Sequence, residues 1–183
     1  MSRRPSHPLR VIESRRMTLV AATPELVAAD LDGVEAFGGA IGAGVPESWA
    51  PDLYETTAMR AALELLRDPA EHGWSLWYLL SRKHEPPRVL GICGFKGRPD
   101  AAGSVEIGYS VLRQYRVQGY ATEAVARLVT WAFSHANVAE VCAETLPHLR
   151  QSIRVMEKNG FTFTGPGSEQ GVVRYAVTKN SNR

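Results

Sequence analysis

The chain has 183 residues, 44% hydrophobic and 22% charged, which is enough to bury one substantial core. Lysine and arginine outnumber aspartate and glutamate by only 21 to 19, so the chain lacks the strong positive field typical of proteins that bind nucleic acids or membrane surfaces. The sequence has no apolar run near the roughly 20 residues of a membrane span and no secretion signal, so we expect a cytoplasmic protein with no nucleic-acid or membrane partner.

The ends of the chain differ in character from its middle. Residues 1–16 are polar and rich in arginine, which predicts a disordered arm, although such arginines also suit a polyanion. Residues 17–178 are expected to form one domain, followed by a short tail at 179–183. Cys93 and Cys142 lie far apart in apolar runs without metal-ligand spacing, which favours buried thiols and no metal.

The first elements are a strand and two helices. Met17 to Ala21 reads as a strand. Thr23 is placed to cap a helix whose first position is Pro24, a strong start signal. The glycines between 38 and 44 predict a loop, and alanines and leucines predict a second helix over 57–67.

The period then changes from helical to extended. Two bulky apolar runs, 74–81 and 89–95, are separated by Pro86-Pro87 and predict a hairpin. Apolar residues alternate over 105–111 as in a strand. The remaining pattern predicts a helix over 122–135, a strand over 138–145, a helix over 151–159, and strands over 161–164 and 172–177. This order is typical of an α/β fold with one mixed sheet and helices on both faces.

A short glycine-containing loop joins the strand at 105–111 to the next helix. It reads Arg116-Val117-Gln118-Gly119-Tyr120-Ala121. The first turn of a helix has unpaired N–H groups, and Gly119 lets the backbone approach a ligand closely. The loop therefore suits a pyrophosphate, to which the Thr122 hydroxyl would add a donor. Taken alone, it also fits a simple turn in which glycine relieves crowding.

Four motifs in a fixed order resemble the GNAT acyltransferases, in particular the ribosomal-protein-alanine N-acetyltransferase-like branch. They are Glu106-Ile107-Gly108-Tyr109, the loop continuing through Thr122-Glu123-Ala124, Glu144-Thr145-Leu146-Pro147, and the segment from Ser152 to Phe161. The resemblance implies a mostly antiparallel sheet of about six or seven strands with about four helices.

The resemblance also implies an activity. It is transfer of an acetyl group from acetyl-CoA to a primary amine, either a protein N-terminus or a small molecule, by direct attack in a ternary complex. The protein would be a bacterial-like monomer or homodimer without a metal.

In this family the strand near Tyr109 to Leu112 splays from the strand ending at Thr145, and the pantetheine arm fills the gap. The Val111 N–H would then polarise the thioester carbonyl. One departure is Leu149, which stands where relatives commonly carry an asparagine that contacts coenzyme A. The cofactor-binding residues that the resemblance implies are Val111, Leu112, Arg113, Arg116, Val117, Gln118, Gly119, Tyr120, Ala121, Thr122 and Lys158.

The reaction needs a base for the amine and a proton for the leaving thiolate. Glu106 is the candidate base, and its alternative is a structural carboxylate paired with an arginine. Glu144, on the neighbouring strand, is the second candidate for the base. Ser152 resembles the serine that serves this branch near the sulfur, and its alternative is a hydroxyl at a helix start. Tyr109 is equally consistent with the core.

The candidate acceptor-site residues are Trp49, Tyr54, Trp77 and Glu144, with Glu47, Asp52 or Glu55 attracting a cationic amine. The tryptophans fit a core or an interface equally well.

Other functional classes are disfavoured or open. Glu144, His148 and Ser152 are spaced for a hydrolytic triad, but the sequence has no G-x-S-x-G elbow, which favours helix capping. The P-loop and dinucleotide-binding patterns both fail, because the glycines near 42–44 lack the residues that must follow them. A catalytically idle acyl-CoA sensor or interaction protein stays open, since a fold alone does not establish turnover.

Overall fold

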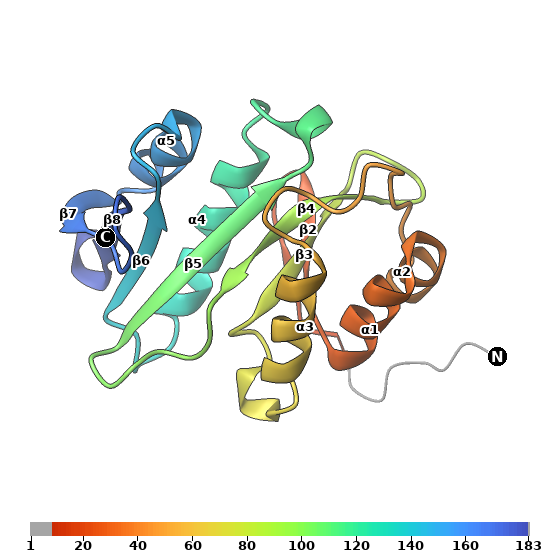
Figure 1. Cartoon of the computed structure of the whole chain (residues 1–183), viewed down its shortest axis with the longest axis horizontal. Helices are drawn as coiled ribbons and strands as arrows, with labels where there is room; N and C mark the ends of the chain where they lie inside the picture. Colours follow the sequence, from red (N-terminus) through yellow and green to blue (C-terminus); the bar gives the residue numbers. More distant parts are fainter. Residues whose placement is uncertain (1–8, 183) are drawn as a thin grey trace.

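A twisted sheet of eight strands runs through the molecule, with helices on both of its faces (Figure 1). The computed structural model describes residues 9–182. The strand order is β1-β2-β3-β4-β5-β6-β8-β7, and only the β5–β6 pair is parallel. The strands are β1 Val11–Glu13, β2 Met17–Ala21, β3 Leu76–Ser81, β4 Arg88–Phe95, β5 Ser104–Val111, β6 Glu140–Thr145, β7 Thr162–Pro166 and β8 Val173–Thr178.

Five α-helices and three short 3-10 turns complete the described chain. None of the described helices has the length and apolar character needed to cross a membrane. The α/β fold class is confirmed, with β1 and α2 as additions to the expected elements. The helices are α1 Pro24–Asp32, α2 Val34–Ile41, α3 Thr56–Leu65, α4 Tyr120–Phe133 and α5 Arg150–Lys158, and the 3-10 turns are η1 Pro69–Glu71, η2 Arg113–Tyr115 and η3 Lys179–Asn182.

Strand β3 has both faces covered, which explains its uninterrupted apolar sequence. Trp77 and Leu79 belong to the core cluster that packs against α4. Tyr78 and Leu80 belong to the opposite cluster, which packs against α1, α2 and α3. Trp77 is 0% exposed, and its indole N–H donates to the Gly73 carbonyl at 2.9 Å. The expectation that Trp77 lines an acceptor site is therefore corrected: it is a core residue on the α4 face.

Two elements differ from the sequence prediction, and both differences have a packing cause. Helix α2 forms where glycines predicted a loop, because Phe37 and Ile41 lie one turn apart and are both buried. Gly38 allows this helix to pack closely, since a Cβ there would lie 3.2 Å from the Ala43 carbonyl oxygen.

Strand β1 forms within the segment predicted to be a disordered arm. Its residues Val11 to Glu13 pair with Val20 to Thr18 of β2, so ordered structure begins within that segment. Residues 1–8 of the predicted arm lie outside the described residues. At the other end, the tail is attached through Lys179, whose N–H donates to the Ala139 carbonyl at 3.0 Å.

Asp30 of α1 is a buried carboxylate with three donors. It accepts from Trp49 Nε1 at 2.6 Å, from the Tyr54 hydroxyl at 3.1 Å and from the Tyr78 hydroxyl at 3.0 Å. Burial raises the pKa of Asp30 against the opposing effect of these hydrogen bonds. Trp49 stacks on Phe37, with ring centroids 5.4 Å apart. Tyr54, at 2% exposed, is thus a core residue, a correction to its expected acceptor role, while Trp49 keeps only a partly exposed edge.

Replacing Asp30 with alanine should destabilise the fold by about 2–4 kcal/mol, because buried donors lose their common acceptor. Urea unfolding followed by circular dichroism measures this loss. The control is Asp32→Ala at the exposed end of the same helix, for which we expect a change within about 0.5 kcal/mol. Equal effects of the two substitutions would contradict the role given to Asp30.

Candidate functional site

Strands β5 and β6 are paired only at the start of β5, where Ser104–Glu106 lies beside Glu140–Cys142. Beyond these residues the two strands part (Figure 1). On the β4 side, the Leu112 N–H donates to the Leu90 carbonyl at 2.9 Å. Because backbone groups point to alternate sides along a strand, Val111 turns its N–H and C=O toward the open side. The expected splay is therefore confirmed, and the Val111 N–H faces the gap.

The loop after β5 presents a row of free backbone donors. Within residues 9–182, the amides from Val117 to Thr122 donate to no protein acceptor. Val117 has φ 61° and Gly119 has φ 81°, and these left-handed residues turn the chain into α4. Val117 is 88% exposed, so burial of its side chain does not offset its backbone strain of about 1–2 kcal/mol. With the positive end of the α4 dipole, these amides form an anion cradle.

Arg116 joins the end of β5 to the segment that precedes α3. Its Nε donates to the Val111 carbonyl at 2.9 Å, and its Nη2 donates to Asp52 Oδ2 at 2.8 Å. The hydrogen bond from Arg116 holds the pKa of Asp52 below its usual value. A cavity of about 260 Å³ lies between the segments 48–52 and 112–116. The guanidinium of Arg116 therefore links the end of β5 to Asp52 through these two hydrogen bonds. We call this link, which lies beside the gap, the brace.

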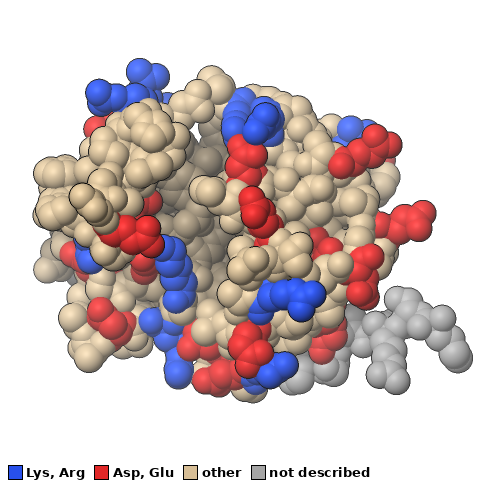
Figure 2. All heavy atoms as spheres, in the orientation of Figure 1, with Lys and Arg blue, Asp and Glu red and all other residues tan. Residues whose placement is uncertain are grey.

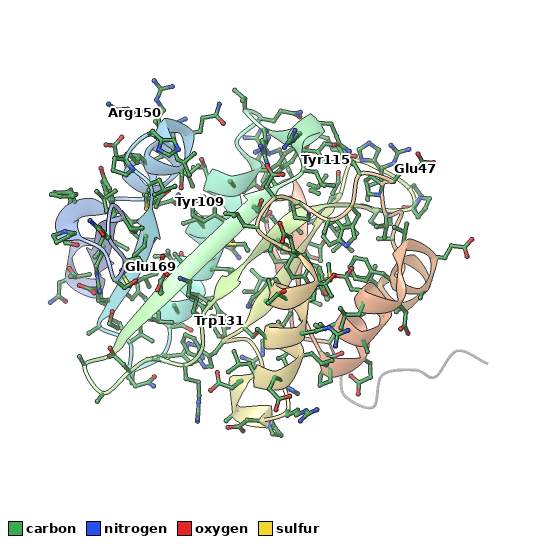
Figure 3. All side chains as sticks on the ribbon, viewed as in Figure 1. Glu47, Tyr109, Tyr115, Trp131, Arg150 and Glu169 are labelled. Carbon is green, nitrogen blue, oxygen red and sulfur yellow. The ribbon has the colours of Figure 1, made fainter. Side chains whose placement is uncertain are left out.

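Tyr109 and Ser152 meet on the α5 side of β5, and Figure 3 shows Tyr109 between β5 and α5. The Tyr109 hydroxyl donates to the Ser152 carbonyl at 2.9 Å and lies 3.1 Å from Ser152 Oγ. Burial raises the pKa of Tyr109 to about 12, so the phenol keeps its proton at neutral pH. Ser152 is the third residue of α5, and its hydroxyl faces Tyr109 instead of capping the helix. The pair places two hydroxyl protons next to each other.

Glu106 points to the opposite side of β5, toward the face that α1, α2 and α3 cover further along the sheet. Its carboxylate contacts the Lys96 ammonium, and its side chain is 24% exposed. The pairing anticipated for a structural carboxylate is thus present, with lysine in place of arginine. Figure 2 shows this face of the molecule as a hollow between two lobes, with acidic and basic side chains on its rims.

Glu144 has a structural partner. Its carboxylate accepts from the Ser168 N–H at 3.0 Å and from the Ser168 hydroxyl at 2.6 Å, and the hydroxyl contact lowers its pKa. It therefore holds the turn between β7 and β8. Since Ser152 contacts Tyr109 and Glu144 contacts Ser168, the residues spaced for a hydrolytic triad are not assembled as one.

Lys158 lies at the end of α5, beside a recess of about 300 Å³ between α4 and α5. The neighbouring Asn159 donates through Nδ2 to the Thr122 carbonyl at 3.3 Å, which brings this end of α5 to the first turn of α4. Leu149 precedes α5 and is 42% exposed. Lys158 thus lies beside the recess next to α4, and it forms no ion pair within residues 9–182.

Sequence reasoning missed Arg16, because it assigned this residue to the disordered arm. Arg16 lies in the turn between β1 and β2 and contacts Gln118, Tyr120 and Glu123 in and after the loop. In the sequence, the only indication of this contact was that Arg16 carries a charge opposite to that of Glu123. Residues 9–182 contain no cluster of histidine, cysteine, aspartate and glutamate that would hold a metal.

The sequence profile of the acetyltransferase (GNAT) domain family matches residues 17–162. The uncharacterized N-acetyltransferase YjdG of Bacillus subtilis is 30% identical over 105 residues, which cover 57% of this chain and 61% of that protein. The uncharacterized N-acetyltransferase p20 of Bacillus licheniformis is 27% identical over 111 residues, covering 61% and 62%. The chain thus spans about three fifths of the length of these relatives.

Solved structures share the fold. The ribosomal L7/L12 alpha-N-protein acetyltransferase RimL superimposes with a TM-score of 0.67 at 18% identity, over 97% of this chain and 98% of that one. RimL in complex with coenzyme A gives a TM-score of 0.66 at 17% identity, over 92% and 98%. The ribosomal-protein-S5-alanine acetyltransferase of Vibrio fischeri gives 0.64 at 14% identity, over 95% and 99%.

Replacing Arg116 with alanine removes the donors that hold Val111 and Asp52. We expect amide hydrogen exchange over residues 48–54 to accelerate by about tenfold or more, because the segment loses its tether to β5. The control is Arg113→Ala, whose side chain is 81% exposed and contacts the same carboxylate at 3.4 Å. Exchange that rises equally in both variants, or in neither, would contradict the brace.

Proposed function

Because the chain belongs to the GNAT acetyltransferase family, we propose that it transfers an acetyl group from acetyl-CoA to a primary amine in a ternary complex. The acceptor is a peptide N-terminus or a small-molecule amine. The observation that carries the proposal is the coincidence of two features: the open side of β5, and the row of free amides that follows it. An extended arm and a diphosphate are the two parts of acetyl-CoA that these features suit.

The cofactor-binding residues divide into two groups. The amides of Gln118, Gly119 and Tyr120 in the middle of the cradle hold the pyrophosphate, with Val117, Ala121 and Thr122 at its ends. Val111 receives the pantetheine arm as a strand would and directs its N–H at the thioester carbonyl, where negative charge develops during attack. Leu112, Arg113 and Arg116 shape the end of β5, and Lys158 adds positive charge for the nucleotide.

The proposed base, Glu106, and the proposed acid, Ser152, lie on opposite sides of β5. Glu106 lies on the side open to an acceptor and takes the amine proton, directly or through a water. Ser152 lies on the α5 side and gives its hydroxyl proton to the leaving sulfur, while its oxygen takes a proton back from solvent. In the step, the nitrogen–carbon bond forms as the carbon–sulfur bond breaks. Tyr109 holds the Ser152 hydroxyl in place and stays protonated at neutral pH, as its raised pKa allows.

The acceptor would approach over the segment 46–55 and the cavity beside Asp52. The partly exposed edge of Trp49 belongs to this wall, whereas Tyr54 supports it from inside the protein. Glu106 and Glu144 give the adjoining surface negative charge that favours a cationic amine.

Turnover is tested directly by measuring free thiol released from acetyl-CoA against a panel of small amines and peptides with free N-termini. We expect release with at least one of them, and none when peptide N-termini are blocked by acetylation. Tight binding of acetyl-CoA without turnover on any acceptor would support a sensor instead.

Replacing Gly119 with glutamate should weaken acetyl-CoA binding by at least about 100-fold, because a carboxylate then occupies the cradle and repels the pyrophosphate. Calorimetric titration measures the change. The control is Gly171→Glu, which carries the same left-handed strain, φ 82° against 81°, in the turn between β7 and β8. Unchanged affinity in Gly119→Glu would remove the loop from the cofactor site.

Replacing Ser152 with alanine should lower kcat by about 100-fold, since the leaving sulfur loses its proton donor, and leave the Kd for acetyl-CoA nearly constant. Tyr109→Phe should slow the same step, and the double variant should be no slower than Ser152→Ala alone. Gln151→Ala, an exposed neighbour on α5, is the control. A normal rate in Ser152→Ala would make the serine structural.

A further inference from the structure

Arg16 is held in a tight turn between β1 and β2. Ser14 closes this turn, since its N–H donates to the Met17 carbonyl at 2.8 Å and its hydroxyl accepts from the Met17 N–H at 3.1 Å. The turn delivers Arg16 to α4, where its own N–H donates to Glu123 Oε1 at 2.9 Å. The backbone position of Arg16 is therefore fixed from both sides.

The Arg16 side chain then extends along the cradle. Its Nε donates to Glu123 Oε2 at 2.7 Å, and its Nη1 donates to the Gln118 carbonyl at 2.8 Å. Its guanidinium carbon lies 4.5 Å from the centre of the Tyr120 ring. The two side chains of the ion pair are only 23% and 18% exposed. The guanidinium thus ties the loop residue Gln118 to the first turn of α4, in a geometry stronger than an ordinary surface pair.

One end of the Arg16 guanidinium has no hydrogen-bond partner in the described part of the chain. Nη2 has no acceptor among residues 9–182 and lies 3.3 Å from the position of a Cβ built on Gly119. Gly119 is the centre of the cradle, so this nitrogen is directed at the place where an anion would lie.

The negative charge of Glu123 gives Arg16 an electrostatic role beside the cradle. Although burial pushes the pKa of Glu123 upward, hydrogen bonds from Ser14 and Arg16 outweigh it and hold the pKa below its usual value. A carboxylate therefore stands, ionised, in the first helical turn, next to the cradle. Without Arg16 its negative charge would oppose any bound diphosphate.

We propose that Arg16 is a cofactor-binding residue, which neutralises Glu123, fixes the loop through Gln118 and donates from Nη2 to the pyrophosphate of acetyl-CoA. The proposal rests on the function proposed above. It places part of the diphosphate site outside the loop and α4, on the turn between the first two strands of the sheet.

The test compares Arg16→Gln with Arg15→Gln, which removes an equal charge from an exposed neighbour that makes no hydrogen bond or ion pair among the described residues. Calorimetric titration with acetyl-CoA should show a loss of about 10- to 100-fold for Arg16→Gln, the range of a lost charge-assisted hydrogen bond, and almost none for Arg15→Gln. S-acetyl-pantetheine has no phosphate and should bind to the wild type and to Arg16→Gln alike. Its binding distinguishes a phosphate contact from a general loss of structure.

A second variant covers the case in which Arg16→Gln folds poorly. In Arg16→Gln/Glu123→Gln both charges are gone, so the fold keeps no unpaired carboxylate, and acetyl-CoA affinity should recover in part but stay below wild type. Equal affinity of Arg16→Gln and Arg15→Gln, or equal losses for acetyl-CoA and S-acetyl-pantetheine, would overturn the role of Arg16 alone. Failure of the wild-type chain to bind acetyl-CoA would overturn the proposed function and this role with it.

Discussion

The early end of the hydrogen bonding between β5 and β6 is the constraint on which the candidate site depends. These strands form the one parallel pair of the sheet, and their pairing stops after Glu106 and Cys142. Strand β5 remains straight beyond this point because its other side is paired with β4 as far as Val111. A strand supported on one side and open on the other offers a ready template for an extended ligand. The loop that follows β5 and the first turn of α4 add free donors at the end of the same track.

The alternation of side chains along β5 gives the two faces of the gap different chemistry. Glu106 faces the hollow on one side, and Tyr109 faces α5 on the other. A single strand thus supplies a carboxylate to one surface and a buried phenol to the opposite one. The two groups therefore have separate partners, Lys96 for Glu106 and Ser152 for Tyr109.

The sequence predicted the elements whose signals are local. Alternation located β5, Thr23 with Pro24 located the start of α1, and Gly119 located the loop before α4. Helix α2 was not predictable from propensity, because Phe37 and Ile41 pack against a partner that the local sequence does not reveal. Tyr54 packs beside Tyr78 on one face of β3, and Trp77 extends from the other face toward α4, so the burial of both depends on contacts distant in the chain. Arg16 was missed for a similar reason, since its partner Glu123 is 107 residues away in the chain.

The position of β8 has a consequence for how the molecule is completed during synthesis. Strand β8 is the last of the described strands in chain order, yet it lies between β6 and β7, and β7 pairs with no other strand of the described sheet. A chain still emerging from the ribosome can therefore assemble β1 to β5, which pair in sequence order, but it cannot close the other part of the sheet. The wall of the gap that β6 provides is paired on its outer side only after β8 has been synthesised. The growing polypeptide thus carries the loop of residues 117–122 well before both walls of the gap beside β5 are in place.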